Sequence, residues 1–201
     1  MSFIDDYTRM CWVYLLKDKS QAFEIFKKFH VWIQNEAQSH IGTICTNNGG
    51  EYTSNQFENY IRRHFKHQTI IPYNPQQNGV AKRMHMTLLN MVVQCCFFKN
   101  VKLLSWADAV LCAMYLRTRS SSHALGNKTF YEMWHGRIPS VRHLSVFGST
   151  CYVLIPKEQR NKLDARSRKC IFLGYLNTTK TYRLYDEVNK EFILSRDEIF
   201  L

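Results

Sequence analysis

The first part of the chain combines a short apolar run with an amphipathic segment. Met10–Leu16 is rich in aromatic and branched side chains, a composition that predicts a strand. Residues 19–37 predict an amphipathic helix, because their apolar positions recur every three or four residues. These positions are Phe23, Phe26, Phe29 and Ile33.

A second strand and helix follow in the sequence. Ile41–Thr46 is a short apolar run that ends at the turn-prone residues Asn47–Gly50. Ser54 is a suitable N-cap for a helix that extends through Arg63. His67–Ile71 predicts a further strand.

The most regular pattern of the chain lies in Gly79–Phe98, which predicts one long helix with a single buried face. Three basic side chains, Lys82, Arg83 and His85, fall on its other faces. The apolar positions that define the buried face are Val80, Met84, Leu88, Met91, Val92 and Cys95.

Two more helices are predicted over Leu103–Arg117 and Thr129–Trp134. The basic and polar residues Arg117–His123 between them are predicted to form a surface connection. The resulting α/β region ends near Pro139 and is assigned to residues 1–140.

Residues 143–201 change to short runs separated by turn residues, which predicts a small all-β barrel. The predicted strands are Ser149–Ile155, Lys169–Tyr175, Thr181–Tyr185 and Glu191–Ser195. Its core is expected to contain Leu163, Ile171, Phe172 and Leu173.

Composition adds a strong positive charge to this picture. Lys and Arg number 27 against 16 Asp and Glu, so the formal net charge is +11 and the sequence pI is about 9.4. Such a balance favours a polyanionic partner, with simple solubility as the alternative. The hydrophobic content of 45% predicts a folded chain, and the lack of a long apolar run predicts no membrane partner.

The cysteines form an odd set without a C-x-x-C pair, and we expect them to be reduced and buried. They are Cys11, Cys45, Cys95, Cys96, Cys112, Cys151 and Cys170. The first residues show no secretory signal pattern, so we expect an intracellular protein, nuclear or cytoplasmic, that is not secreted.

Six strings occur in a fixed order along nearly the whole chain. They are FIDDYTR (3–9), NNGGEYTS (47–54), PYNPQQNGVAKR (72–83), SWADAV (105–110), NKTFYEMWHGRIPSVRHLSVFG (127–148) and KCIFLGY (169–175). Together they resemble the copia-type retrotransposon Pol polyproteins, in their integrase catalytic core and the SH3-like domain that follows it.

The resemblance implies an α/β RNase H-like core and then a small all-β SH3-like barrel. In this family three carboxylates hold two Mg²⁺ or Mn²⁺ ions for DNA strand transfer. The strand that carries the first Asp precedes FIDDYTR in the family and is not among the 201 residues, which implies an N-terminally truncated core. Because that strand lies between the second and fourth strands, these two are expected to lack a shared partner.

The other two carboxylate positions carry different side chains here. The family's second Asp falls at Asn47, a neutral amide, and its Glu falls at Lys82, a cation. Mg²⁺ prefers charged oxygen ligands, and an ammonium group provides no oxygen at all. The resemblance therefore implies a degenerate, inactive site that binds no metal cofactor.

Two basic groups are candidates for binding nucleic acid through its phosphates, without sequence specificity; the alternative is a solvated surface. The first basic group is Arg62, Arg63, Lys66, Lys82, Arg83 and His85. The second basic group is Lys157, Arg160, Lys162, Arg166, Arg168 and Lys169.

The leading hypothesis is an integrase-derived chain without catalysis that still binds DNA or another nucleic acid. One alternative is residual metal-dependent nuclease or strand-transfer activity that recruits Asp5, Asp6 or Glu51, although the family pattern places Asp5 and Asp6 in a turn at a strand end. Two others are a domesticated scaffold for protein interactions and a reading frame without function. The sequence leaves the oligomeric state open.

Overall fold

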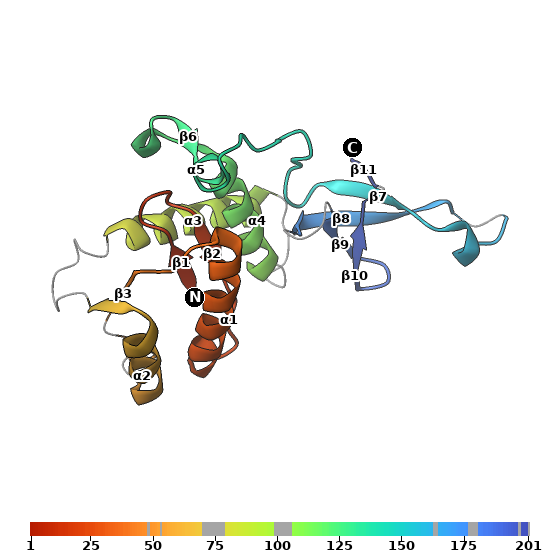
Figure 1. The fold of residues 1–201 in the computed structure, drawn as a ribbon. Helices are drawn as coiled ribbons and strands as arrows, with labels where there is room; N and C mark the ends of the chain where they lie inside the picture. The colour runs from red at the N-terminus through yellow and green to blue at the C-terminus, as the bar shows by residue number, and fades with distance from the viewer. Residues whose placement is uncertain are drawn as a thin grey trace. The chain divides into compact units, whose positions relative to one another are not determined.

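The structure, a computed structural model, describes residues 1–47, 49–52, 54–69, 79–98, 106–162, 165–176, 181–196 and 198–200 (Figure 1). The chain forms two compact units. The first unit contains residues 1–3 and 13–85, and the second contains residues 4–12 and 86–201. Within the described residues, no helix is long and apolar enough to cross a membrane.

The first unit is built around two helices, α1 (Ala22–Ala37) and α2 (Asn55–His64). A single turn of 3-10 helix, Lys19–Gln21, leads into α1, so the predicted helical segment is confirmed. Ser54 is the N-cap of α2 and accepts a hydrogen bond from the Phe57 amide, as predicted. The helices share an aromatic-rich core, whose buried residues are Phe26, Phe57, Ile61 and Phe65.

Two two-stranded sheets are formed by the first four described strands. Strand β1 (Ser2–Ile4) pairs with β2 (Cys11–Val13), and β3 (Thr43–Thr46) pairs in parallel with β4 (Lys66–Thr69) through the α2 crossover. Within the described residues, β1 and β3 belong to different sheets. The predicted end of the last strand, residues 70–71, lies outside the described residues.

Helix α3 (Gly79–Phe98) has the predicted bounds and the predicted buried face. Met84, Leu88 and Val92 are buried, whereas Lys82, Arg83 and His85 are exposed. The helix contributes Gly79–His85 to the first unit and its remaining residues to the second.

The second unit contains α4 (Trp106–Arg119) and the six-residue α5 (Phe130–His135), whose N-cap is Thr129. The predicted start of α4, residues 103–105, lies outside the described residues. Short strands β5 (Ser121–Ser122) and β6 (Lys128–Thr129) pair with each other, and a 3-10 turn, His123–Leu125, lies between them.

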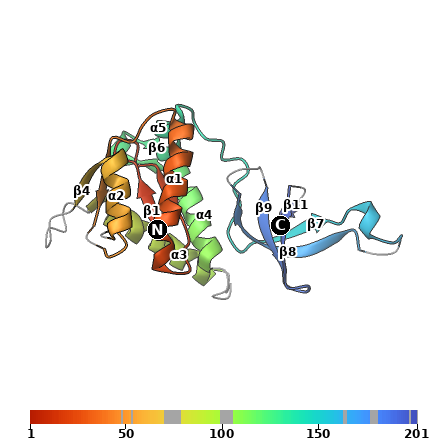
Figure 2. The same cartoon turned by 60° about the horizontal axis from the view of Figure 1, so that its bottom comes forward.

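The β-rich end of the second unit is a five-stranded antiparallel sheet of order β10-β9-β8-β7-β11. Figure 2 shows its long strands β7 and β8 side by side. The four predicted strands are confirmed with small shifts of their ends, and β11 completes the sheet by pairing with β7. Their bounds are β7 Thr150–Leu154, β8 Ser167–Tyr175, β9 Tyr182–Asp186, β10 Glu191–Ser195 and β11 Glu198–Phe200.

The inner face of this sheet buries alternate side chains of its strands. Phe172 is buried in this core as predicted, whereas Leu173 is buried outside the cluster given below, next to an irregularity in the pairing of β8 with β9. Ile171 is half-buried, and Leu163 lies outside the described residues. The buried cluster consists of Cys151, Val153, Cys170, Phe172 and Leu184.

Helix α4 packs on β8, and Gly174 is the point of close approach. A Cβ atom on Gly174 would lie 3.6 Å from the Cys112 Cβ, and the residue has a φ of +145°, a value that side chains disfavour. Beside it, Arg183 Nε of β9 lies 2.8 Å from the buried Asp108 carboxylate of α4. Burial raises the pKa of Asp108, and the Arg183 guanidinium opposes this shift.

The predicted surface connection over Arg117–His123 is wrong in its first part. Helix α4 continues to Arg119, Thr118 is 1% exposed, and the Arg117 guanidinium lies 4.4 Å from the centre of the Phe130 ring. Arginine combines an apolar stem with a planar cation that stacks on aromatic rings, so basic residues need not mark a solvated loop.

One of the cysteine predictions is also wrong. Cys45 is exposed on strand β3, and Cys95 is only half-buried. Cys11, Cys112, Cys151 and Cys170 are buried free thiols as expected.

Replacement of Phe172 tests the β-sheet core. We expect Phe172→Ala to lower the free energy of unfolding by about 3–5 kcal/mol, because a fully buried ring leaves a cavity. The matched control is Phe192→Ala, on an exposed position of β10, with an expected cost of about 1 kcal/mol or less. Equal losses for the two variants in urea unfolding would contradict this assignment of the core.

Candidate functional site

The first position of interest, Asn47, follows the end of β3 and is exposed. Its side-chain Oδ1 accepts a hydrogen bond from the Gly49 amide at 3.2 Å. Asparagine commonly stabilises a turn in this way. The side-chain oxygen of Asn47 therefore stabilises the loop in which Asn47 lies.

The carboxylate closest in sequence to Asn47, Glu51, is also directed at this loop. Its carboxyl group would lie 2.8 Å from a Cβ atom on Gly49, so the side chain folds back over the loop. The Gly49 carbonyl accepts a hydrogen bond from the Tyr52 amide at 2.9 Å. Burial raises the pKa of the Tyr52 hydroxyl, and the negative charge of Glu51 raises it further.

The second position, Lys82, is exposed in the first turn of α3. Two basic residues close to Lys82 in the sequence, Arg83 and His85, each contact another residue of the first unit. The Arg83 guanidinium lies over Gly79, with Nη1 3.0 Å from where a Cβ atom would be, and His85 Nε2 lies 2.7 Å from Ser2 Oγ. Burial lowers the pKa of His85, and the positive N-terminus lowers it further.

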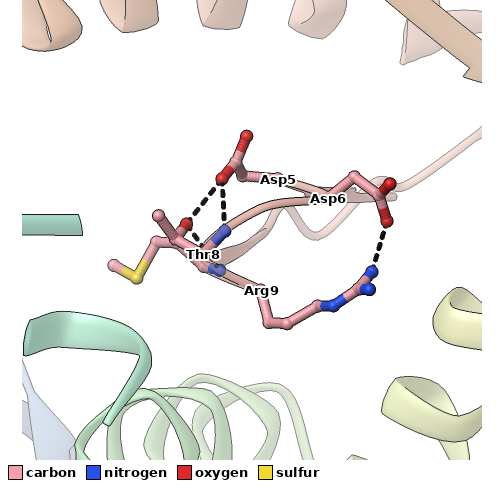
Figure 3. A network of polar contacts seen from close by, with 5 residues as sticks. Asp5, Asp6, Thr8 and Arg9 are labelled. Atoms are coloured by element: carbon pink, nitrogen blue, oxygen red, sulfur yellow. Dashed lines mark hydrogen bonds and ion pairs between the residues drawn. The ribbon is translucent and has the colours of Figure 1, made fainter. Parts of the chain in front are cut away.

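Asp5 and Asp6, which were considered above as alternative metal ligands, lie in a turn between β1 and β2 (Figure 3). Asp5 Oδ2 accepts hydrogen bonds from the Thr8 amide at 2.8 Å and from Thr8 Oγ1 at 2.6 Å. Asp6 forms an ion pair with Arg9, whose φ of 61° is left-handed. The strand-end turn expected from the sequence is present, and it uses both carboxylates.

The side chains of this region do not fit a divalent metal. Among the described residues, no three His, Cys, Asp or Glu side chains lie close enough to hold an ion. Asn47 provides one neutral oxygen that already accepts a hydrogen bond, and Lys82 provides a cation. Such a donor set is the reverse of the oxygen-rich, anionic one that Mg²⁺ requires.

The first basic group is exposed throughout and comes from two places in the first unit. Arg62, Arg63 and Lys66 lie at the junction of α2 and β4, and Arg62 forms a 3.4 Å ion pair with Glu58. Lys82, Arg83 and His85 lie on the first turns of α3. Each half of the first basic group therefore consists of residues that are close together in the sequence.

The second basic group lies at one end of the β7–β8 hairpin. Ser167–Cys170 of β8 pairs with β7 alone, so this end extends beyond β9. Lys157 belongs to a 3-10 turn, Lys157–Gln159, that follows β7. Arg168 forms a 2.6 Å ion pair with Glu191, which leaves Lys157, Lys162, Arg166 and Lys169 as the exposed cations.

One cavity in the second unit was not predicted. It has a volume of about 570 Å³ and lies beside α4, α5 and the strands β8 and β9. Three arginines, Arg119, Arg137 and Arg142, line it together with four tyrosines. These residues are scattered between positions 115 and 182, so no spacing in the sequence could have identified them.

Comparison with known families and proteins places the chain among mobile-element polyproteins. Residues 149–201 match the family "Retroviral polymerase SH3-like domain". The "Retrovirus-related Pol polyprotein from transposon TNT 1-94" of Nicotiana tabacum is 41% identical over all 201 residues, which span 15% of that polyprotein. The corresponding polyprotein from transposon RE1 of Arabidopsis thaliana is 33% identical over 90% of the chain, which corresponds to 12% of its own length.

Solved structures similar to the chain share its fold at low sequence identity. A chain of the simian T-cell lymphotropic virus intasome in complex with PP2A regulatory subunit B56 gamma has a TM-score of 0.54 and 18% identity, covering 97% of this chain and 70% of that one. The HTLV-2 integrase catalytic core domain in complex with magnesium has a TM-score of 0.50 and 18% identity, with coverage of 67% and 82%. The predicted α/β integrase-core fold followed by an SH3-like domain is confirmed.

The turn at Asp5 provides a test of what its carboxylate does. We expect Asp5→Ala to lower the free energy of unfolding by about 1–2 kcal/mol, because the partly buried amide and hydroxyl groups of Thr8 lose their hydrogen-bond acceptor. Asp6→Ala is the matched control, since the Asp6 side chain is 93% exposed, and should change stability by about 0.5 kcal/mol or less. A larger loss for Asp6→Ala than for Asp5→Ala would refute this role.

Proposed function

Because the chain belongs to the copia-type, retrovirus-related Pol polyproteins, we propose that it is an integrase-derived segment that binds nucleic acid without catalysing strand transfer. The proposal has two parts, the loss of metal chemistry and the retention of phosphate binding. We also propose that residues 1–140 form the integrase-core-like domain and residues 143–201 the SH3-like domain.

The observation that carries the first part is the pair Asn47 and Lys82. Two unit charges about 4 Å apart interact by roughly 1 kcal/mol in water and by roughly 4 kcal/mol at an effective dielectric constant of 20. A divalent ion doubles either value, so the Lys82 ammonium would repel an ion that a glutamate would attract. Asn47 cannot compensate, because its amide carries no charge and already accepts a bond from Gly49.

The two basic groups support the second part. Phosphate contacts need cationic side chains within reach of the backbone and tolerate imprecise geometry. The net charge of +11 and the exposed lysines and arginines of the β7–β8 hairpin provide such contacts. Nothing in this arrangement selects one base over another, so the binding that we propose is independent of sequence.

Restoring the carboxylates tests the loss of metal binding. We expect the midpoint of thermal unfolding of the wild-type chain to be unaffected by millimolar Mn²⁺. The variant Asn47→Asp/Lys82→Glu should gain about 2–4 °C, because a metal that binds only the folded state stabilises it.

The control for this experiment carries the same change of charge at a different place, as Asn47→Asp/Lys17→Glu, with an exposed lysine replaced. It should show no gain with Mn²⁺. A Mn²⁺-dependent rise in the wild-type chain, or an equal rise in both variants, would count against the role given to Lys82.

Gel retardation of a DNA duplex at a series of salt concentrations tests nucleic-acid binding. Retention should weaken steeply with salt, because each phosphate contact releases condensed counterions. Removing three exposed cations of the second basic group should lower the slope of log K against log salt by about 2–3. That variant is Lys157→Gln/Lys162→Gln/Arg166→Gln.

The charge-matched control replaces three exposed lysines outside both groups, as Lys17→Gln/Lys128→Gln/Lys190→Gln. It should retain a steeper slope than the hairpin variant. The absence of retention at low salt, or retention that does not respond to salt, would refute the proposal.

A further inference from the structure

The cavity of the second unit has the dimensions of a small-molecule site. Its volume of about 570 Å³ falls within the range of roughly 300–1,000 Å³ that such sites occupy. Its walls come from α4, from α5 and the segment after it, and from the ends of β8 and β9. None of its lining residues belongs to either basic group.

Arg119 forms the most constrained part of the wall. Its guanidinium carbon lies 3.4 Å from the centre of the Tyr115 ring and 4.9 Å from that of Tyr131. Nη1 donates to the Tyr115 carbonyl at 3.1 Å and to Thr118 Oγ1 at 3.3 Å, so the planar group is held flat on the ring. Burial lowers the pKa of Arg119.

Two further cations face the same cavity. Arg137 and Arg142 are exposed residues of the segment after α5, and Arg137 Nη2 donates to Tyr131 Oη at 3.4 Å. Among the described residues that line the cavity, none is an aspartate or a glutamate. Three arginines without a lining carboxylate give the cavity a positive potential, and arginine binds phosphate through two parallel hydrogen bonds.

Aromatic rings provide the rest of the wall. Tyr115 and Tyr175 stack with centroids 4.3 Å apart at an interplanar angle of 18°. The hydroxyl of Tyr175 accepts from the Ser145 amide at 2.8 Å, and that of Tyr182 donates to the His143 carbonyl at 2.8 Å. Because each hydroxyl is tied to the backbone, the rings are fixed in place before any ligand arrives.

We propose that this cavity binds a nucleoside monophosphate, either as a free nucleotide or as the phosphorylated end of a nucleic-acid strand. The phosphate would pair with the arginines, and the base would lie against the flat wall of guanidinium and tyrosine groups. Aromatic and guanidinium faces stack on any base, so the site accepts the nucleotide class and not one base. Proposed binding to duplex DNA through the basic groups is independent of this site.

The combination of side chains separates this ligand from two others. Inorganic phosphate would use the arginines but none of the tyrosines. An acidic peptide would likewise pair with the cations and gain little from a layered stack of planar groups. A nucleotide is the ligand that uses both kinds of wall.

Calorimetric titration of the full chain with AMP tests the site, with inorganic phosphate and adenosine as separate titrants. We expect AMP to bind at least tenfold more tightly than either. Arg142→Gln and Arg137→Gln/Arg142→Gln should weaken AMP binding by at least tenfold, and these exposed replacements should leave the unfolding midpoint unchanged. The control Lys157→Gln/Lys162→Gln should bind AMP as the wild type does.

Three results would overturn the proposal. They are no heat with AMP at millimolar concentration, equal affinity for inorganic phosphate and AMP, and displacement of AMP by poly-glutamate as effectively as by a second nucleotide. A short 5′-phosphorylated oligonucleotide identifies the source of the ligand. Competition between it and AMP supports a strand end, whereas AMP binding without competition supports a free nucleotide.

Loss of AMP binding in the arginine variants with an unchanged gel retardation of duplex DNA would support the cavity separately from the basic groups. If the arginine variants instead weaken duplex retention and leave AMP affinity unchanged, the cavity assignment is wrong, whatever the outcome for the basic groups.

Discussion

Repulsion between the Lys82 ammonium group and a divalent cation is the physical constraint on which our account of this chain depends. The end of β3 and the first turn of α3 both belong to the first unit. The side chains there are a neutral amide and a cation, and the Glu51 carboxylate contacts its own loop. In our proposal, the scaffold persists while the charges of its former metal site are inverted.

The parts of the fold that the sequence predicted are those in which local signals and packing agree. The apolar stripe of Gly79–Phe98 has the period of a helix and is buried as one face, and Ser54 caps α2 through its own side chain. The alternating runs after residue 143 became the strands of a sheet with Phe172 at its centre. In each case a few neighbouring residues carry enough information to determine the element.

The errors arose where contacts distant in sequence decide the outcome. Arg117 was placed on the surface by its charge, but it is half-buried and its guanidinium lies over the buried ring of Phe130. Cys45 was placed in the core by its apolar neighbours, but in β3 it is exposed while the next residue, Thr46, is buried. The cavity lined by arginines and tyrosines brings together positions more than sixty residues apart, so no sequence motif could have predicted it.

The central claim is that the site performs no metal-dependent chemistry on DNA, and incubation of the purified chain with supercoiled plasmid and Mg²⁺ or Mn²⁺ tests it most directly. We expect the fraction of nicked plasmid to equal that of the incubation without protein, at any metal concentration. Metal-dependent nicking by the wild-type chain that Glu51→Gln abolishes would contradict the claim, because it would show that a local carboxylate has replaced the lost ligands.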